Sequence, residues 1–215
     1  MGNEKYINRA EAMRYLMLGE TLPEGRITEL LAGCENELIQ AAKPRFVSRE
    51  FEISDCPIDI SGDEVKAHLS GCKKVLLFAA TLGSEPDRLV RAYQINDITK
   101  AVIFNACADA FIESFCEEAD SALASAYSKQ YLTWRYGVGY AGLPLSEQKK
   151  LLDSIDANRR IGLSVSDSFI LTPLKSVTAV IGISDSPIDK KRRGCAVCAM
   201  KENCAYRKAG KRCGY

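Results

Sequence analysis

The chain has 215 residues, of which 47% are hydrophobic and 27% are charged, and its formal net charge is +1. This composition is ordinary for a soluble globular protein, and the balanced charge argues against nucleic acid or any other partner recognised by overall charge. No apolar run approaches the roughly 20 residues of a membrane span. The polar N-terminus, MGNEKYINRAEAM, lacks a signal-peptide pattern, so we expect a cytoplasmic protein without membrane attachment.

The N-terminal region predicts two antiparallel helices. Asn8 and Glu11 have the spacing of a capping box, and apolar residues follow them at helical intervals. A second helical pattern runs from Ile27 toward Pro44, after the turn residues LPEG. We therefore expect a helical hairpin over about residues 8–43.

The next segments predict strands and a long helix. Val47–Ile53 alternates like a half-buried strand, and the continuous apolar run Val75–Ala80 is typical of a central one. A short helix over Asp63–Leu69 lies between them. The longest helical pattern runs from Ile98 to Tyr127.

Two acids, Asp109 and Glu113, lie one turn apart on that helix. Acids on a solvated face are the default interpretation, although Asp109 has apolar and small neighbours that also permit burial.

The C-terminal half predicts a helix over Ser146–Arg159 and strands over Ile161–Val165 and Val177–Ile183. Helices outnumber strands, and strands do not alternate regularly with helices. The fold class is therefore α+β, with a mixed or antiparallel sheet and several packed helices.

The segment WRYGVGYAGLP, residues 134–144, is the strongest binding-site candidate in the sequence. Its glycines (Gly137, Gly139 and Gly142) allow a close approach of backbone to ligand. Arg135 offers a planar set of donors that suits a carboxylate or a phosphate, and the tyrosines at 136 and 140 look exposed. A glycine-rich connection with a surface arginine explains the same residues, and both interpretations stay open at this point.

This segment also fits G-x-G-x-x-G, the dinucleotide-binding pattern. That pattern has force only between a hydrophobic strand and a helix that begins at its last glycine. Here Pro144 delays the helix, and the preceding strand pattern is weak. We expect no Rossmann unit.

His68 is the only histidine, and H-L-S-G at residues 68–71 matches the end of the D-x-H-x-x-G signature of cobalamin-binding domains. Lys66 stands where the aspartate must be, and a lysine cannot accept the imidazole N–H. His68 is interpreted as a surface or boundary residue rather than a cobalt ligand.

The nine cysteines divide into two groups. The scattered ones, of which Cys34, Cys107 and Cys116 fall in helical patterns, are expected to be buried reduced thiols. The other four lie within a basic tail over residues 186–215, which we expect to be an appendage to a domain over residues 1–185. These four candidates for zinc or an iron–sulfur cluster are Cys195, Cys198, Cys204 and Cys213. A basic tail with free thiols is the alternative.

Taken together, several segments carry a resemblance to a known family. They are FAATLG (78–83), KAVIFNACADAFIE (100–113), RYGVGYAGLPLSEQK (135–149) and IGLSVSDSFILTPLKSVTAVIGI (161–183). In this order, over about residues 5–185, the chain resembles the activation (reactivation) domain of cobalamin-dependent methionine synthase, in its short stand-alone version.

The resemblance implies a module that binds S-adenosylmethionine (AdoMet) and supports the reductive methylation of inactive cob(II)alamin on a partner protein. The electron would come from a flavodoxin-like donor. The module would be a component of methionine synthase rather than an enzyme alone.

The resemblance also implies roles for particular residues. Arg135 would bind the AdoMet carboxylate, the Gly137 backbone would contact the ligand, and the Gly139–Tyr140 pair would match the family's Gly-Tyr. Tyr140 would border the sulfonium, and Asp109 would help to hold the ligand. Lys129 stands where the family has a second acid.

Two other functions remain open on the residues alone. The tail could make the chain an iron–sulfur reductive activator of corrinoid methyltransferases. It could instead be a zinc-ordered tail on a non-catalytic binding module.

Overall fold

The computed structural model describes residues 7–16, 25–188, 202–203 and 208. The four tail cysteines, Cys195, Cys198, Cys204 and Cys213, lie outside these residues, so the predicted metal site stays a prediction. Within the described residues, no helix is long and apolar enough to cross a membrane.

The main sheet is built on two long central strands, β2 (Lys74–Thr81) and β7 (Ser176–Ser184), which pair along their whole length. The strand β1 (Arg45–Glu52) flanks β2, while the two-residue strands β3 (Tyr131–Leu132) and β4 (Tyr136–Gly137) both pair with β7. Every pairing in the described part of the chain is antiparallel. The α+β prediction, the central position of 75–80 and the absence of a Rossmann unit are all confirmed.

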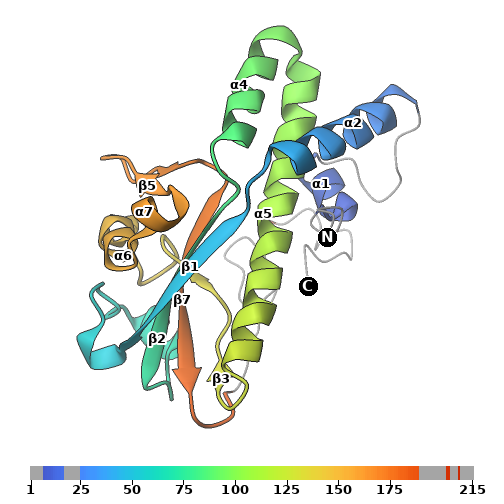
Figure 1. Ribbon diagram of the computed structural model, residues 1–215. Coiled ribbons are helices and arrows are strands. Elements are labelled where there is room, and N and C mark those ends of the chain that lie inside the picture. The colour runs from blue at the N-terminus through green and yellow to red at the C-terminus, as the bar shows by residue number, and fades with distance from the viewer. Residues whose placement is uncertain (1–6, 17–24, 189–201, 204–207, 209–215) are drawn as a thin grey trace.

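Both faces of the sheet are covered, which explains why β2 reads as a continuous apolar run. Alternate residues of β2 enter different cores. Leu76, Phe78 and Ala80 pack toward the long helix α5 (Ile98–Ala126), and Val75, Leu77 and Ala79 pack toward the opposite layer. In Figure 1, α5 with its neighbouring helices lies on one side of the sheet and the α6–α7 region lies on the other.

The helices around α5 are α1 (Arg9–Tyr15), α2 (Arg26–Ala41) and α4 (Glu85–Asn96), and all three contact it. The predicted cap is present, because the Asn8 side chain accepts a hydrogen bond from the Glu11 amide. Both N-terminal helices therefore form as predicted. They share α5 as their main packing partner and are linked by an ion pair between Arg9 and Glu35.

The predicted helix over Ser146–Arg159 is wrong, because the structure divides it. A 3₁₀ turn at Leu145–Glu147 leads into α6 (Gln148–Ser154), and α7 (Ala157–Ile161) follows after a break. Asp156 adopts a left-handed conformation there, with φ of 55°. Ile155 and Ile161 are both buried, yet on one continuous helix they would face about 120° apart. The break brings both into the core.

The predicted strand over Ile161–Val165 is also shorter than expected. Ile161 ends α7, and only Ser164–Val165 forms a strand, β5. It pairs with β6 (Leu171–Thr172) in a separate two-stranded sheet. The short helix α3 (Asp63–His68) and the 3₁₀ turn η2 (Ile53–Asp55) complete the layer opposite α5.

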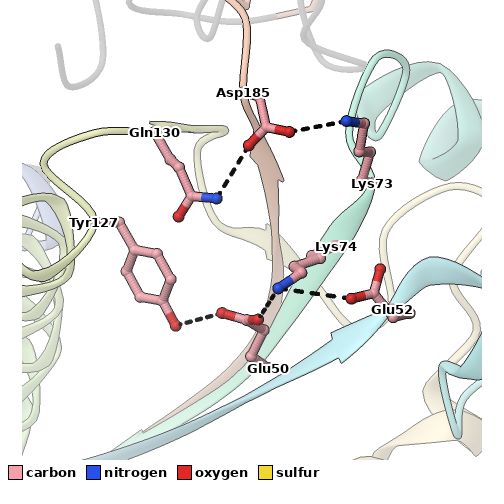
Figure 2. A network of polar contacts seen from close by, with 7 residues as sticks. All are labelled: Glu50, Glu52, Lys73, Lys74, Tyr127, Gln130 and Asp185. Carbon is pink, nitrogen blue, oxygen red and sulfur yellow. Dashed lines mark hydrogen bonds and ion pairs between the residues drawn. The ribbon is translucent and has the colours of Figure 1, made fainter.

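A polar network fixes the C-terminal end of α5 to the sheet (Figure 2). Glu50 of β1 accepts hydrogen bonds from Lys74 of β2, at 2.7 Å, and from the hydroxyl of Tyr127 after α5, at 3.0 Å. Gln130 and Lys73 both bond to Asp185, which follows β7. The segment that leaves α5 is thereby held against the end of the sheet, and it leads directly into β3 and the candidate loop.

Candidate functional site

Arg135 lies between β3 and β4, and its side chain is only 6% exposed. Its Nε donates a hydrogen bond to Oδ2 of Asp120 at 2.9 Å, and its Nη1 lies 4.0 Å from Oε2 of Glu113. Burial disfavours the charge, but the Cys116 sulfur and these two carboxylates raise the pKa of Arg135 above its usual value. The guanidinium is therefore a buried, permanently charged group, and the surface-arginine interpretation is wrong.

Three acids of α5 lie along one stripe that faces this region. Asp109, Glu113 and Asp120 are separated by four and seven residues, which are spacings that place side chains on one helix face. Sequence reasoning treated Glu113 as a solvated acid and did not consider Asp120. The seven-residue spacing was the available signal, but nothing local connects it to an arginine 15 residues beyond Asp120.

The structure ties Asp109 to a different cation. Lys175, in the turn before β7, donates to Oδ1 of Asp109 at 2.6 Å and to Oδ1 of Asn105 at 2.8 Å. Asn105 in turn donates to the other oxygen of Asp109. Because Lys175 is 9% exposed and Asp109 only partly exposed, the predicted ligand residue Asp109 also has a structural task.

The glycine loop after Arg135 is a tight turn hydrogen-bonded to itself and to the sheet. The amide of Val138 donates to the carbonyl of Thr178, and the amide of Gly139 donates to the carbonyl of Leu143. Gly139 has φ of +100°, a conformation that favours glycine. A Cβ on Gly137 would lie 3.2 Å from the ring of Tyr140, so this glycine lets the ring lie against the backbone.

The two tyrosines of the loop differ, contrary to the prediction that both are exposed. Tyr140 is 56% exposed, but Tyr136 is 8% exposed and its hydroxyl donates to the carbonyl of Ala141. Burial raises the pKa of Tyr136. Tyr136 is thus a structural support of the loop, and Tyr140 presents the accessible aromatic face.

His68 lies behind the loop in a half-buried aromatic cluster. Its ring centroid is 4.6 Å from that of Trp134 and 4.9 Å from that of Tyr136. Its Nε2 lies 2.9 Å from Oγ1 of Thr133, which also accepts a hydrogen bond from the Gly182 amide. This placement agrees with the interpretation of His68 as a boundary residue.

A cavity of about 470 Å³ lies between η2 and α3, and Arg135, Asp109 and the glycine loop do not line it. Its lining residues are Ile53, Cys56, Ile58, Asp59, Ile60, Ser61, Lys66, Leu69 and Cys72. Gly62, which follows the lining residue Ser61, nevertheless packs against the glycine loop, because a Cβ on Gly62 would lie 2.2 Å from the carbonyl oxygen of Gly142. Cavity and site are neighbours with separate linings.

Three of the five scattered cysteines, Cys34, Cys107 and Cys116, are buried thiols as predicted, whereas Cys56 and Cys72 are only partly buried. Burial raises the pKa of Cys34 to about 11 and the pKa values of Cys107 and Cys116 to about 12. These thiols stay protonated and unreactive near neutral pH. Within the described residues, no group of three or more His, Cys, Asp or Glu side chains could hold a metal ion.

Comparison with known proteins agrees with the resemblance. The family model described as "Vitamin B12 dependent methionine synthase, activation domain" matches residues 60–187, which include Asp109 and the whole glycine loop. A solved structure described as "Crystal Structure of the MetH Reactivation Domain bound to AdoHcy" has 17% sequence identity and a TM-score of 0.62. The match covers 97% of this chain and 83% of the other, and it shows a shared fold. No curated protein sequence matches the chain. Since the family model spans more than half of its residues, the chain belongs to the activation-domain family of vitamin B12-dependent methionine synthase.

Proposed function

We propose that the chain binds AdoMet at Arg135 and the glycine loop and supports the reductive methylation of inactive cob(II)alamin on a partner methionine synthase. The observation that carries this proposal is the buried guanidinium of Arg135, which faces an acidic stripe and adjoins an exposed tyrosine. The solved structure of similar fold, whose description names bound AdoHcy, adds support. The chain would act as a component of the methyltransferase.

The charges suit the amino-acid end of AdoMet, which carries a carboxylate and an ammonium on one carbon. Arg135 and Glu113 place a cation and an anion 4.0 Å apart. The Arg135 guanidinium would bind the carboxylate as a charge-assisted pair, and Glu113 would accept from the ammonium. The exposed ring of Tyr140 would lie beside the sulfonium, since an aromatic face attracts a cation.

In the proposed reaction, the cob(II)alamin carried by the partner protein is the substrate. One electron from a flavodoxin-like donor reduces the cobalt, whose electron pair then forms a bond to the methyl carbon of AdoMet. The C–S bond breaks, its electron pair stays on sulfur, and AdoHcy leaves. The residues of this chain would hold the sulfonium in place and present its methyl group.

Calorimetric titration of AdoMet into the full chain tests the proposal. Arg135→Ala removes a charged hydrogen-bond pair, so its affinity should fall by about 1.5–3 kcal/mol, or roughly tenfold or more. Arg159→Ala is the matched control, because Arg159 is exposed and forms a surface ion pair with nearby Asp156; the affinity of this variant should not change. An unaltered affinity in a folded Arg135→Ala protein, or no binding by the wild type, would reject the assignment.

A further inference from the structure

Asp120 holds one particular edge of the Arg135 guanidinium. The hydrogen bond of 2.9 Å is made by Nε, whereas Nη1 lies 4.0 Å from the Glu113 carboxylate, which is too far for a hydrogen bond. A guanidinium presents two flat donor edges, one through Nε and one through its terminal nitrogens. The edge through Nε is occupied, and the terminal edge is turned toward the partly exposed Glu113.

We propose that Asp120 is a positioning residue that keeps the terminal nitrogens of Arg135 available for the carboxylate of the ligand. This inference rests on the proposed function, since it assumes that AdoMet binds at Arg135. Asp120 lies 34% exposed on α5 and acts through Arg135. It therefore sets the site's selectivity for ligands that carry a carboxylate next to the ammonium.

The physical argument depends on the competing acid. Arg135 is almost fully buried, so its charge requires a carboxylate neighbour. If Asp120 is removed, Glu113 is the remaining acid within 4.0 Å among the ion pairs of the described residues. The guanidinium would then turn and close a hydrogen-bonded pair with Glu113. A ligand carboxylate would have to break that pair, and Glu113 would no longer be free to accept from the ligand's ammonium.

The test compares two ligands on the same folded proteins. AdoMet carries the carboxylate, and decarboxylated AdoMet lacks it but keeps the sulfonium, the amine and the adenosine. Both are titrated by calorimetry into the wild type, Asp120→Ala, Asp120→Asn and Asp120→Glu, and folding is checked by circular dichroism. Glu118→Ala is the matched control, because Glu118 is an exposed acid of α5 whose spacing from Glu113 and Asp120 places it on the opposite helix face.

Asp120→Ala should weaken AdoMet binding by roughly fivefold to tenfold more than it weakens the binding of decarboxylated AdoMet, because AdoMet loses the contacts to its carboxylate and its ammonium, whereas decarboxylated AdoMet loses only the contact to its amine. Asp120→Asn keeps an oxygen that accepts from Nε but removes the carboxylate that the buried charge requires, so its loss of AdoMet affinity should be smaller than that of Asp120→Ala without returning to the wild-type value. Asp120→Glu keeps the charge but moves the acceptor by one methylene, so it should again weaken AdoMet more than decarboxylated AdoMet. Glu118→Ala should match the wild type with both ligands.

Three results would overturn the inference while leaving the proposed function intact: unchanged AdoMet affinity in Asp120→Ala, equal losses with both ligands, or an Asp120→Asn loss as large as that of Asp120→Ala. If Asp120→Ala does not fold, the test rests on Asp120→Glu. An Asp120→Glu protein that binds AdoMet as tightly as the wild type would contradict the positioning role. No binding of AdoMet by the wild type would reject both the proposed function and this inference.

Discussion

The ammonium of Lys175 lies 2.6 Å from the carboxylate of Asp109, and this ion pair joins the turn before β7 to the middle of α5. The Lys175 side chain is 10% exposed and that of Asp109 is 36% exposed. The cation is therefore the more deeply buried partner, and it depends on Asp109 for a neutralising charge and on Asn105 for a second hydrogen bond. The pair lies one helical turn from Glu113, so it also sets the position of the acidic stripe.

Asp109→Ala should destabilise the protein by about 1–2 kcal/mol, because it leaves the buried ammonium with a neutral acceptor. The value lies below the 3–5 kcal/mol of a fully buried pair, since Asp109 is partly exposed. Urea denaturation measures the change. The double variant Asp109→Ala/Lys175→Met should be less destabilised than Asp109→Ala alone. Asp153→Ala, which removes an exposed pair with Lys149, should have no measurable effect. If Asp109→Ala and Asp153→Ala lower the free energy of unfolding equally, the burial argument is wrong.

Gly62→Ala should disturb the glycine loop from outside it. The new Cβ would lie 2.2 Å from the carbonyl oxygen of Gly142, and backbone cannot give way as a flexible side chain can. We expect a loss of about 1–3 kcal/mol in the free energy of unfolding, as for other overpacked sites, together with weaker AdoMet binding. Gly33→Ala is the control: it lies in α2 with nothing within 4 Å of the new Cβ, and should stabilise the helix by about 0.5–1 kcal/mol. A Gly62→Ala protein as stable as the wild type would contradict the contact.

The buried thiols predict a loss of stability at alkaline pH. Burial raises the pKa of Cys107 from 9.0 to about 12, so this thiol ionises at a lower pH in the unfolded chain than in the folded protein. Its contribution is fully present below about pH 9 and is lost as the pH rises toward 12, at about 1.4 kcal/mol per pH unit. Urea unfolding at pH 8 and pH 10 measures the slope. Cys107→Ala should lower stability at both values but give a shallower slope, and an identical slope would show that another group titrates.

The parts of the fold that were predictable from sequence are those whose pattern is long and local. The apolar run of β2 and the 29-residue helix α5 have patterns strong enough to locate them within one or two residues. The break at Asp156 was not predictable, because the helical pattern continues through it and the buried residues on both sides, Ile155 and Ala157, become evident only in the folded chain. Likewise Tyr136 is buried through a two-residue strand whose pairing partner, Val180, lies 44 residues away.

The candidate site was likewise predictable only where its residues are close together in the sequence. Arg135 and the glycines form one contiguous segment, so composition alone marked them. The acids that lie beside Arg135 are on α5, and only the return of the chain through β3 brings Arg135 to Asp120 and Glu113. That contact depends on how the sheet packs against the helix, which no local pattern encodes.

The isolated chain should not retain cobalamin, because its only histidine has no acidic orienting partner at position 66 and lies in the aromatic cluster behind the loop. Visible absorption after gel filtration with added cobalamin measures retention. The chain should instead associate with a cobalamin-bearing methyltransferase, detected by co-elution of the coloured partner. Stoichiometric corrinoid on the chain alone would contradict the division of labour between the two proteins.

The charge balance of the site predicts that AdoMet binds more tightly than AdoHcy. Two carboxylates, those of Glu113 and Asp120, face the Arg135 guanidinium, so this cluster has a formal charge of minus one. AdoMet has one more positive charge than AdoHcy, at its sulfonium. A unit charge several ångströms away near a protein surface is worth about 1 kcal/mol after screening, or roughly fivefold in affinity.

Calorimetry with both ligands at low and high salt measures the ratio of the AdoMet and AdoHcy affinities. The preference should shrink as salt rises, and Glu113→Gln should reduce it at low salt, while Glu118→Ala, which removes an acid from the opposite face of α5, should leave it nearly unchanged. Equal affinities at low salt, or tighter binding of AdoHcy, would show that the acidic stripe does not sense the sulfonium.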